Sequence, residues 1–130
     1  MLKIRPIETK EAQKTASEAC KVTYYPNCMA YGAYIDDEFI GISQFTLDDN
    51  FGYIKNIAPA DGVDDFEAMF IMGRATMNFI DLCHVHKCYI ESSETLERLI
   101  LALGFKRQDG GKFLADMTNM FTNPCKNESK

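Results

Sequence analysis

Apolar and polar residues alternate along much of the first half of the chain, and this period of two predicts β-strands. The alternation runs through residues 2–7, 29–35, 39–47 and 51–58. Residues 8–21 are instead rich in Ala, Lys, Glu and Gln, which predicts a helix that ends before Pro26. Because Asp36-Asp37 and Asp48-Asp49-Asn50 are suited to turns, the last three strands are expected to form an antiparallel meander.

The period of the apolar residues changes to that of a helix after Pro59. Apolar positions from Phe66 to Cys83 then fall on one helical face. Asp64 and Glu67 have the spacing of a capping box at the start of this segment. The pattern therefore predicts one long helix over residues 64–83.

The remaining segments are short and are bounded by clear stop signals. Residues 87–91 predict a strand, and Ser92 or Ser93 is suited to cap a helix over residues 96–103. Gly104 stands at the position where helices commonly end. Residues 105–107 and 112–117 complete the pattern as two strands of a hairpin that turns through Asp109-Gly110-Gly111.

This order of elements predicts an α/β (α+β) fold, with about seven strands in a mixed, mainly antiparallel sheet flanked by three helices. The fourth and fifth strands are joined through the long helix, and such a connection is a right-handed crossover between parallel strands. We expect these two strands to splay apart and to form a cleft at their junction. A single domain is expected over residues 1–118, followed by a polar C-terminal tail over residues 119–130.

The composition fits this picture and excludes several kinds of partner. The 130 residues are 46% hydrophobic and 25% charged, which is ordinary for one globular domain. A net charge of −5 gives no support for binding nucleic acid or a membrane surface. We expect a cytoplasmic protein, because no segment approaches the ~20 apolar residues of a membrane span and the first residues lack the apolar stretch of a signal peptide. The five cysteines are odd in number and irregularly spaced, so free thiols are predicted.

The segment Cys83-His84-Val85-His86-Lys87-Cys88 contains four side chains of the kinds that bind zinc or copper. Structural zinc sites usually combine one close pair of ligands with a second pair from farther along the chain. This segment instead spans the end of the long helix and the start of the next strand, so we expect Cys83 to face the core and the two histidines to face solvent. No metal site is predicted.

Two short motifs, in this order of elements, resemble the GNAT superfamily of acyl-CoA-dependent N-acetyltransferases, of which the chain would be a divergent member. Ile57-Ala58-Pro59 precedes the long helix, and Leu103-Gly104-Phe105-Lys106 follows the next helix. The resemblance covers most of the chain and implies acetyl transfer from acetyl-CoA to the amine of a small molecule or peptide. It also implies that the thioester lies between strands four and five, with the pantetheine arm paired to the backbone of Asn56, Ile57 and Ala58.

The predicted cofactor loop departs from the family pattern Q/R-x-x-G-x-G/A, in which glycines expose N–H groups to the pyrophosphate at a helix N-terminus. The matching segment, Asp61-Gly62-Val63-Asp64-Asp65-Phe66-Glu67, has one glycine, no basic residue and four carboxylates. The resemblance assigns cofactor contact to Gly62, Val63, Asp64 and Asp65. One unit-charge pair at a few ångströms costs on the order of 1 to 4 kcal/mol. We therefore expect acetyl-CoA to bind weakly or not at all, and the acidic segment to favour a cationic ligand.

The catalytic groups are also atypical. Many family members have, four residues before the Gly-Phe pair, a tyrosine that acts as general acid for the leaving thiolate. This chain has Ile100 at that position. Candidates for a general base are Glu91, at the end of the fifth strand, and Asp48 and Asp49, at a turn of the meander. Two functions therefore remain open: an N-acetyltransferase with an atypical cofactor loop, or a non-catalytic GNAT-like binding or regulatory module that has lost acetyl-CoA binding.

Several residues indicate the character of the expected acceptor side. Many family members have two helices where residues 8–28 hold one helix and a loop, so the acceptor side is expected to be open. Four tyrosines are expected near this opening, where they would suit an apolar or cationic ligand: Tyr24, Tyr25, Tyr31 and Tyr53. Lys55 and Arg74 are the basic residues nearest to the acidic segment by sequence.

Overall fold

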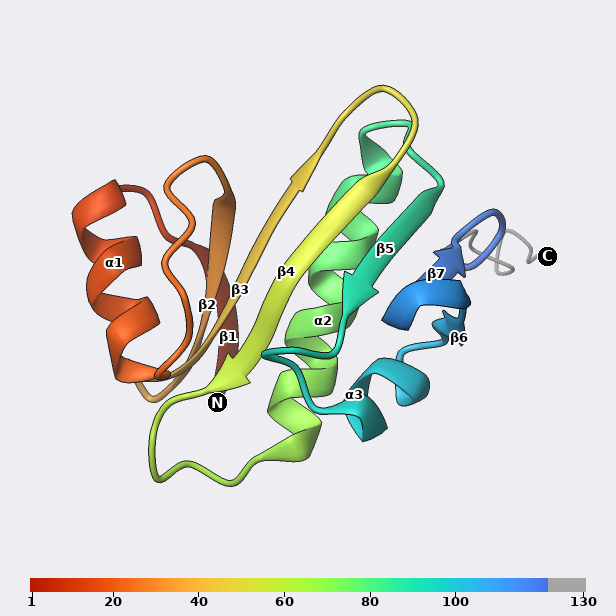
Figure 1. Ribbon diagram of the computed structural model, residues 1–130. Coiled ribbons are helices and arrows are strands. Elements are labelled where there is room, and N and C mark those ends of the chain that lie inside the picture. Colours follow the sequence, from red (N-terminus) through yellow and green to blue (C-terminus); the bar gives the residue numbers. More distant parts are fainter. Residues whose placement is uncertain (122–130) are drawn as a thin grey trace, which may run out of the picture.

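The computed structural model describes residues 1–121, which form a seven-stranded sheet and three α-helices (Figure 1). The strand order is β1-β2-β3-β4-β5-β7-β6, and every pairing is antiparallel except that of β4 with β5. The strands are β1 (Leu2–Pro6), β2 (Met29–Ile35), β3 (Glu38–Leu47), β4 (Gly52–Pro59), β5 (Lys87–Glu91), β6 (Lys106–Arg107) and β7 (Lys112–Asp116). The helices are α1 (Lys10–Ala19), α2 (Phe66–Leu82) and α3 (Glu97–Ala102), and a short 3₁₀ turn spans Asp109–Gly111. The fold class predicted from the sequence is confirmed.

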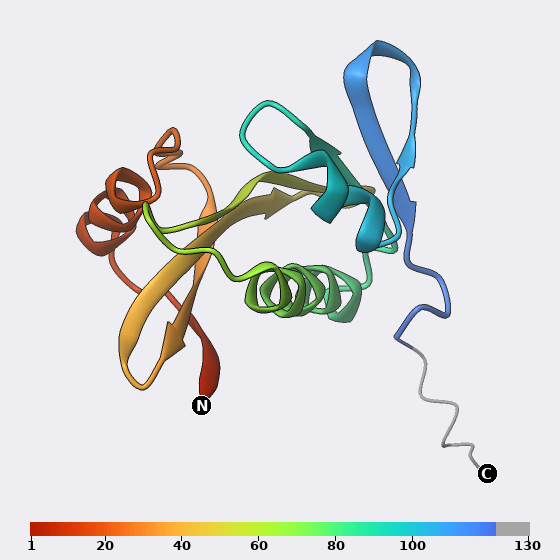
Figure 2. The ribbon, with the colours of Figure 1, turned by 90° about the horizontal axis from the view of Figure 1, so that it is seen from below.

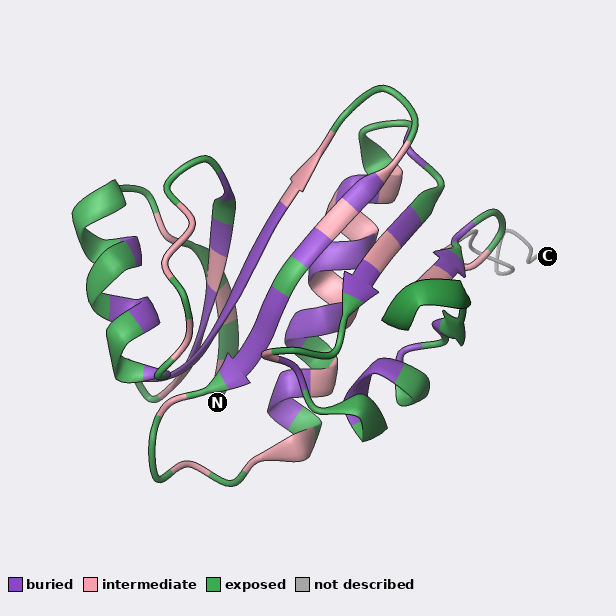
Figure 3. Cartoon of the chain, in the orientation of Figure 1, coloured by how far each residue is buried: buried purple, intermediate pink, exposed green. Residues whose placement is uncertain are grey.

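The two longer helices pack on opposite faces of the central strands (Figure 2). Successive residues of β3 show this arrangement, because Ile42 belongs to a small cluster with Ala16 of α1, whereas the Ser43 hydroxyl lies 2.9 Å from that of Thr76 on α2. The buried residues accordingly follow β3, β4 and the inward side of α2 (Figure 3). The main core therefore lies between α2 and the sheet.

The start of α2 differs by one residue from the predicted capping box. The helix begins at Phe66, and Asp65 caps it by accepting a hydrogen bond from the backbone N–H of Ala68 at 3.0 Å. Asp64 therefore lies too early in the chain to form a capping box with Glu67. Either aspartate can cap a helix, so the sequence alone did not show which of these two neighbouring residues is the N-cap of α2.

The start of α3 also corrects the sequence prediction. Leu96 occupies the N-cap position, and no side chain makes a capping hydrogen bond there, so neither Ser92 nor Ser93 caps the helix. The residues between β5 and α3 form a bent loop, whose polar side chains bind other elements. The predicted end of the helix is confirmed, because Gly104 follows α3 with a φ of 103°.

Gly73 allows α2 to lie close to α3 and β4. A Cβ atom at this position would lie 2.8 Å from Leu103 Cδ1 and 3.2 Å from Ile57 Cδ1. We expect Gly73→Ala to lower the free energy of unfolding by about 1 to 3 kcal/mol, because overpacking outweighs the better helix propensity of alanine. Urea denaturation measures the change, and unaltered or increased stability would contradict this close packing.

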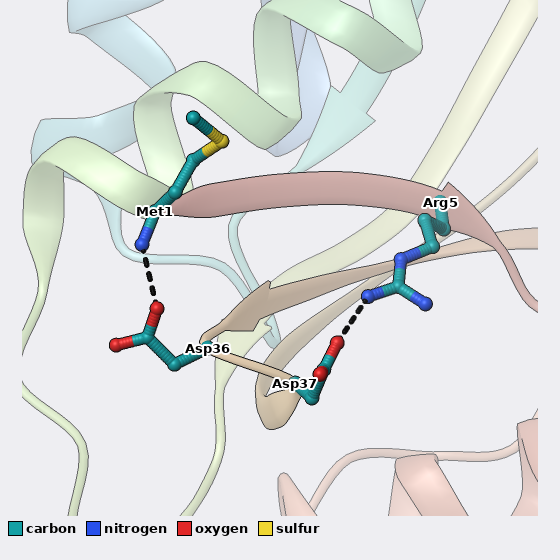
Figure 4. Close-up of polar contacts among 4 residues, drawn as sticks. All are labelled: Met1, Arg5, Asp36 and Asp37. Atoms are coloured by element: carbon teal, nitrogen blue, oxygen red, sulfur yellow. Dashed lines mark hydrogen bonds and ion pairs between the residues drawn. The ribbon is translucent and has the colours of Figure 1, made fainter.

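The first strand is fastened to the turn between β2 and β3 (Figure 4). The Met1 ammonium contacts Asp36 at 2.9 Å, and the Arg5 guanidinium contacts Asp37 at 3.0 Å. The hydrogen bond from the ammonium lowers the pKa of Asp36 below its ordinary value. Three of the four groups are largely exposed and Arg5 is about half exposed, so these ion pairs define the geometry of the turn more than they stabilise the fold.

The last described residues remain in contact with the domain. Met120 and Phe121 pack against the main core, and the Phe121 ring lies 5.0 Å from the guanidinium carbon of Arg74. Residues 122–130, which include most of the predicted tail and Cys125, lie outside the described residues. Within residues 1–121, no helix has the length and apolar character needed to cross a membrane.

Candidate functional site

β4 carries one extra residue at the point where β5 leaves it. Gln44 and Phe45 are neighbours on β3, but their partners on β4 are Asn56 and Ile54, which leaves Lys55 as a β-bulge. The pairing of β4 with β5 ends at Ile54. Because a bulge bends the strand that carries it, the rest of β4 diverges from β5. This divergence confirms the predicted splay between the two parallel strands.

The loop of residues 92–96, here called the wedge loop, runs from β5 back towards the diverging part of β4 (Figure 1). The backbone N–H of Ile57 donates to the Thr95 hydroxyl at 3.0 Å. The Glu94 carboxylate accepts from the backbone N–H of Thr23 at 2.8 Å, from the Thr23 hydroxyl at 2.9 Å and from the Asn56 amide at 3.3 Å. The wedge loop thus joins β4 to the loop that follows α1.

Three buried amide side chains, from α1, β3 and β4, lie beneath this contact. The Gln13 amide donates to Gln44 Oε1 at 2.9 Å, and the Gln44 amide donates to Asn56 Oδ1 at 3.2 Å. Gln44 also accepts from the backbone N–H of Tyr25 at 2.9 Å and donates to the Thr23 carbonyl at 2.7 Å. Satisfied buried networks of this kind favour one arrangement of the groups that they join. The sequence did not reveal this network.

A cavity of about 130 Å³, here called the α2 cavity, lies at the N-terminus of α2. Its walls include five of the seven residues to which the family resemblance assigned cofactor contact: Ile57, Ala58, Val63, Asp64 and Asp65. Asn56 does not line it, because its amide belongs to the buried network, and Gly62 lies outside it at a φ of 85°. The carboxylate of Asp65 is already used to cap α2.

Arg98 is a basic residue of the α2 cavity that the sequence did not reveal. Its guanidinium carbon lies 4.3 Å from the centre of the Phe66 ring, so the charge is held beside the start of α2. Arg74, by contrast, packs on the rings of Phe70 and Phe121 and does not line the cavity. Lys55 lines a different cavity. Arg98 is therefore the basic residue that can offset the carboxylates of the α2 cavity, whereas Asp61 of the acidic segment is paired with Lys21 at 3.4 Å.

A larger cavity of about 600 Å³, here called the sheet cavity, lies on the face of β4 and β5 away from α2. A Cβ atom on Gly52 would meet Ile80 of α2, so the neighbouring Tyr53 points to the opposite face. The cavity is lined by Tyr25, Phe51, Tyr53, Ile54, Lys55, Tyr89, Ile90, Glu91, Ser93, Gln108, Asp109 and Lys112. These residues come from the loop after α1, from the turn between β3 and β4, from β4 and β5, from the wedge loop and from the β6–β7 hairpin.

The three candidate bases have different surroundings. Glu91 is exposed at the end of β5 and lines the sheet cavity. Asp48 accepts hydrogen bonds from the backbone N–H groups of Phe51 and Asn50, both at 2.8 Å, and these bonds lower its pKa. Asp49 is exposed in the same turn, and neither aspartate lines the cavity. Of the three, the structure brings only Glu91 to a cavity beside the splayed strands.

The tyrosine predictions are partly correct. Tyr25 and Tyr53 line the sheet cavity, whereas the half-buried Tyr24 does not. The prediction for Tyr31 is wrong, because its ring stacks on Phe45 at 5.4 Å and packs with the core. Ile100 is fully buried, as its place on an apolar helix stripe predicts.

The segment around the two histidines also corrects one prediction. Cys83 is exposed rather than turned to the core, because α2 ends at Leu82 and Cys83 is its C-cap residue. His86 Nδ1 lies 2.6 Å from an Asp81 carboxylate oxygen. Within the part of the chain that the structure describes, no group of three or more Cys, His, Asp or Glu side chains is arranged to hold a metal ion.

The described thiols are free, and three of the four are buried, whereas Cys83 is exposed. Burial raises the pKa of Cys20 and of Cys88 from the ordinary value of 9.0 to about 12. In native protein at pH ~8, we expect iodoacetamide to alkylate Cys83 well before Cys20, Cys28 or Cys88, since thiolates are the reactive form. Peptide mass spectrometry identifies the labelled residue, and early labelling of Cys88 would contradict the structure.

The same shifts predict a loss of stability in alkali. A buried thiol stays protonated in the native protein, while the unfolded chain ionises it above its ordinary pKa of 9.0. The two buried thiols therefore make their full contribution to the free energy of unfolding below a pH of 9.0. This contribution is lost as the pH rises towards their native pKa of about 12.

No protein-family model matches the sequence, and no curated protein matches it significantly. Solved structures nevertheless share its fold. PaiA N-acetyltransferase from Thermoplasma acidophilum, in complex with coenzyme A, has a TM-score of 0.70 and 12% identity, covering 89% of this chain and 99% of that chain. The ribosomal-protein alanine N-acetyltransferase of Escherichia coli has a TM-score of 0.71 and 10% identity, covering 90% of this chain and 94% of that chain.

A GNAT family acetyltransferase from Elizabethkingia anophelis, with acetyl-CoA bound, has a TM-score of 0.61 and 15% identity. The match covers 88% of this chain and 97% of that chain. Similarities at these identities reflect a common fold rather than a common activity. The chain therefore has the fold of the GNAT acetyltransferases, as the order of its elements and its two short motifs predict.

Proposed function

We propose that the protein is an acyl-CoA-dependent N-acetyltransferase with an atypical cofactor loop, whose acceptor is the amine of a small molecule or peptide. The observation that carries this proposal is the bulge at Lys55, from which β4 and β5 diverge. The sheet cavity borders β4 at Ile54 and Lys55, and the α2 cavity borders it at Ile57 and Ala58. A thioester on one side and an amine on the other would meet at this break in the sheet.

The residues of the α2 cavity fit acetyl-CoA in part. Beyond Ile54, the edge of β4 is not paired with β5, and Arg98 supplies a positive charge beside the start of α2. Two other features oppose binding, because the Thr95 hydroxyl already accepts from the Ile57 N–H and Asp65 already caps α2. We infer that acetyl-CoA binds weakly and displaces the wedge loop. PaiA and the Elizabethkingia anophelis protein, which share the fold, hold coenzyme A or acetyl-CoA.

The proposed base is Glu91, which lines the sheet cavity at the end of β5. Its carboxylate would take a proton from the amine, as the new N–C bond forms and the C–S bond of the thioester breaks. Ile100 offers no acidic group to the leaving thiolate, which would take a proton from water, and Glu91 would return its proton to the hydroxide that remains. Acetyl-CoA supplies the acetyl group as a substrate.

The test is a search for acetylated products in a panel of amines incubated with the protein and acetyl-CoA. Mass spectrometry is the suitable detector, because five cysteines would react with thiol reagents that detect free coenzyme A. We expect a protein-dependent product that falls in Glu91→Gln and persists in Glu38→Gln, a control at an exposed carboxylate of β3. The absence of any product above the uncatalysed level, in wild type and in Thr95→Val, would overturn the proposal.

The second candidate function is a non-catalytic binding or regulatory module. It is favoured by the wedge loop, since Thr95 and Glu94 satisfy polar groups of β4 and of the loop after α1 from within the chain. This alternative requires that the sheet cavity binds its ligand without turnover and that acetyl-CoA does not bind even when Thr95 is replaced.

A further inference from the structure

Two opposite charges lie next to each other on the sheet cavity without pairing. Glu91 of β5 and Lys112 of β7 are direct partners in the antiparallel ladder, where Cβ atoms lie about 5 Å apart. Among residues 1–121, the ion pairs within 4.0 Å do not include either side chain. The Lys112 ammonium instead lies 5.9 Å from the centre of the Tyr89 ring. Both charges line the cavity and are therefore accessible to a ligand.

Lys55, the bulge residue, brings a second ammonium group to the same cavity. It lies 5.7 Å from the centre of the Tyr25 ring, and the described ion pairs do not include it either. An exposed contact between an ammonium and a ring is weaker than a charge-assisted hydrogen bond to a carboxylate. A carboxylate on the ligand would therefore compete successfully with the rings for these lysines.

The wall between these charges is aromatic. Phe51 lies 5.2 Å and Tyr53 lies 6.1 Å from Tyr89, measured between ring centres. Such a surface favours a flat apolar group, which can stack on it or meet it edge to face. A volume of about 600 Å³ is within the range of small-molecule pockets.

We propose that the acceptor is a free α-amino acid with an aromatic side chain, a proposal that rests on the proposed function. Its ammonium would face Glu91, its carboxylate would face Lys112 and Lys55, and its ring would lie on the aromatic wall. A single carbon separates the two charges of an α-amino acid, which matches the adjacent positions of Glu91 and Lys112. A simple amine would leave both lysines without a partner, and a peptide N-terminus has no carboxylate next to its ammonium.

Binding is measured without acetyl-CoA, so that the result does not depend on turnover. The chain has no tryptophan, and three of its six tyrosines line the sheet cavity, so tyrosine fluorescence reports on this site. The probes are L-phenylalanine, L-phenylalanine amide, phenethylamine and 3-phenylpropionate. We expect L-phenylalanine to bind about tenfold more tightly than each of the other three, since each lacks one of the two charges.

Variants identify the contacts. Lys112→Met is expected to weaken L-phenylalanine binding about tenfold and to leave phenethylamine unchanged. Glu91→Gln is expected to weaken both ligands and to leave 3-phenylpropionate unchanged. The control is Lys106→Met, an exposed lysine of β6 that does not line the cavity, and it should change nothing. Equal binding of L-phenylalanine and its amide, or of L-phenylalanine and phenethylamine, would overturn the proposal.

The assignment of the ligand and the proposed acetyltransferase activity can be contradicted independently of each other. If L-phenylalanine binds with this pattern but no acetylated product is found by mass spectrometry, the ligand assignment stands and the proposed activity fails. If other amines are acetylated while L-phenylalanine does not bind, the ligand assignment fails and the proposed activity stands.

Discussion

Replacing Gln44 with leucine is expected to lower the free energy of unfolding by about 3 kcal/mol and to release the loop that follows α1. The side chain of Gln44 is fully buried and contacts four polar groups, which belong to Gln13, Thr23, Tyr25 and Asn56. Leucine fills a similar volume but satisfies none of them. Each buried group left without a partner costs about 1 to 3 kcal/mol, and relaxation of the loop recovers part of the sum.

Urea denaturation monitored by circular dichroism measures this loss. The matched control is Gln108→Leu, since Gln108 is an exposed glutamine that donates only to backbone carbonyls of its own hairpin. The control is expected to change stability by less than about 0.5 kcal/mol. A loss below about 1 kcal/mol in Gln44→Leu would show that the amide network does not stabilise the loop.

The second large effect concerns charge. The double variant Asp64→Asn and Asp65→Asn is expected to bind acetyl-CoA about tenfold more tightly at low salt, because it removes two negative charges from the α2 cavity. Asparagine caps helices about as well as aspartate, so the cap that Asp65 provides is retained. The gain should shrink as ionic strength rises and screens the repulsion that was removed.

The matched control is Asp36→Asn together with Asp37→Asn, which makes the same change in net charge at the turn between β2 and β3. Asparagine tolerates the positive φ of both positions, 51° and 71°, so the turn is kept. No change in affinity is expected there. Equal gains in both double variants would attribute the effect to net charge and would contradict a local cause at the α2 cavity.

The fold was predictable from local signals. The change of period after Pro59 and the stop at Gly104 defined α2 and the end of α3, and the crossover rule then made β4 and β5 parallel. The wrong predictions concern the ends of helices, where a shift of one residue changes which side chain caps the helix or faces the core. Asp64 and Asp65 can both cap a helix, and Cys83 continues the apolar stripe of α2 although the helix ends before it.

The site was less predictable, because it depends on contacts between distant segments. The spacing of two apolar residues did indicate the bulge. Ile54 and Ile57 both belong to the main core, although a strict period of two would place them on opposite faces of the sheet. The position of Arg98 near the start of α2 could have been predicted from the topology. Helices α2 and α3 both follow the carboxyl ends of parallel strands, so they begin near the same edge of the sheet. The pairing of Gln44 with Gln13 and Asn56 left no pattern in the sequence, because it joins three separate elements.

Acetyl-CoA is expected to bind at the edge of β4 and to compete there with the chain's own Thr95. Calorimetric titration of acetyl-CoA into wild type, Thr95→Val and Thr95→Ser tests it most directly. Valine has the shape of threonine but cannot accept from the Ile57 N–H, so that group is left for the ligand. We predict weak binding by wild type and by Thr95→Ser, and about tenfold tighter binding by Thr95→Val. Submicromolar binding by wild type, with no improvement in Thr95→Val, would contradict the account.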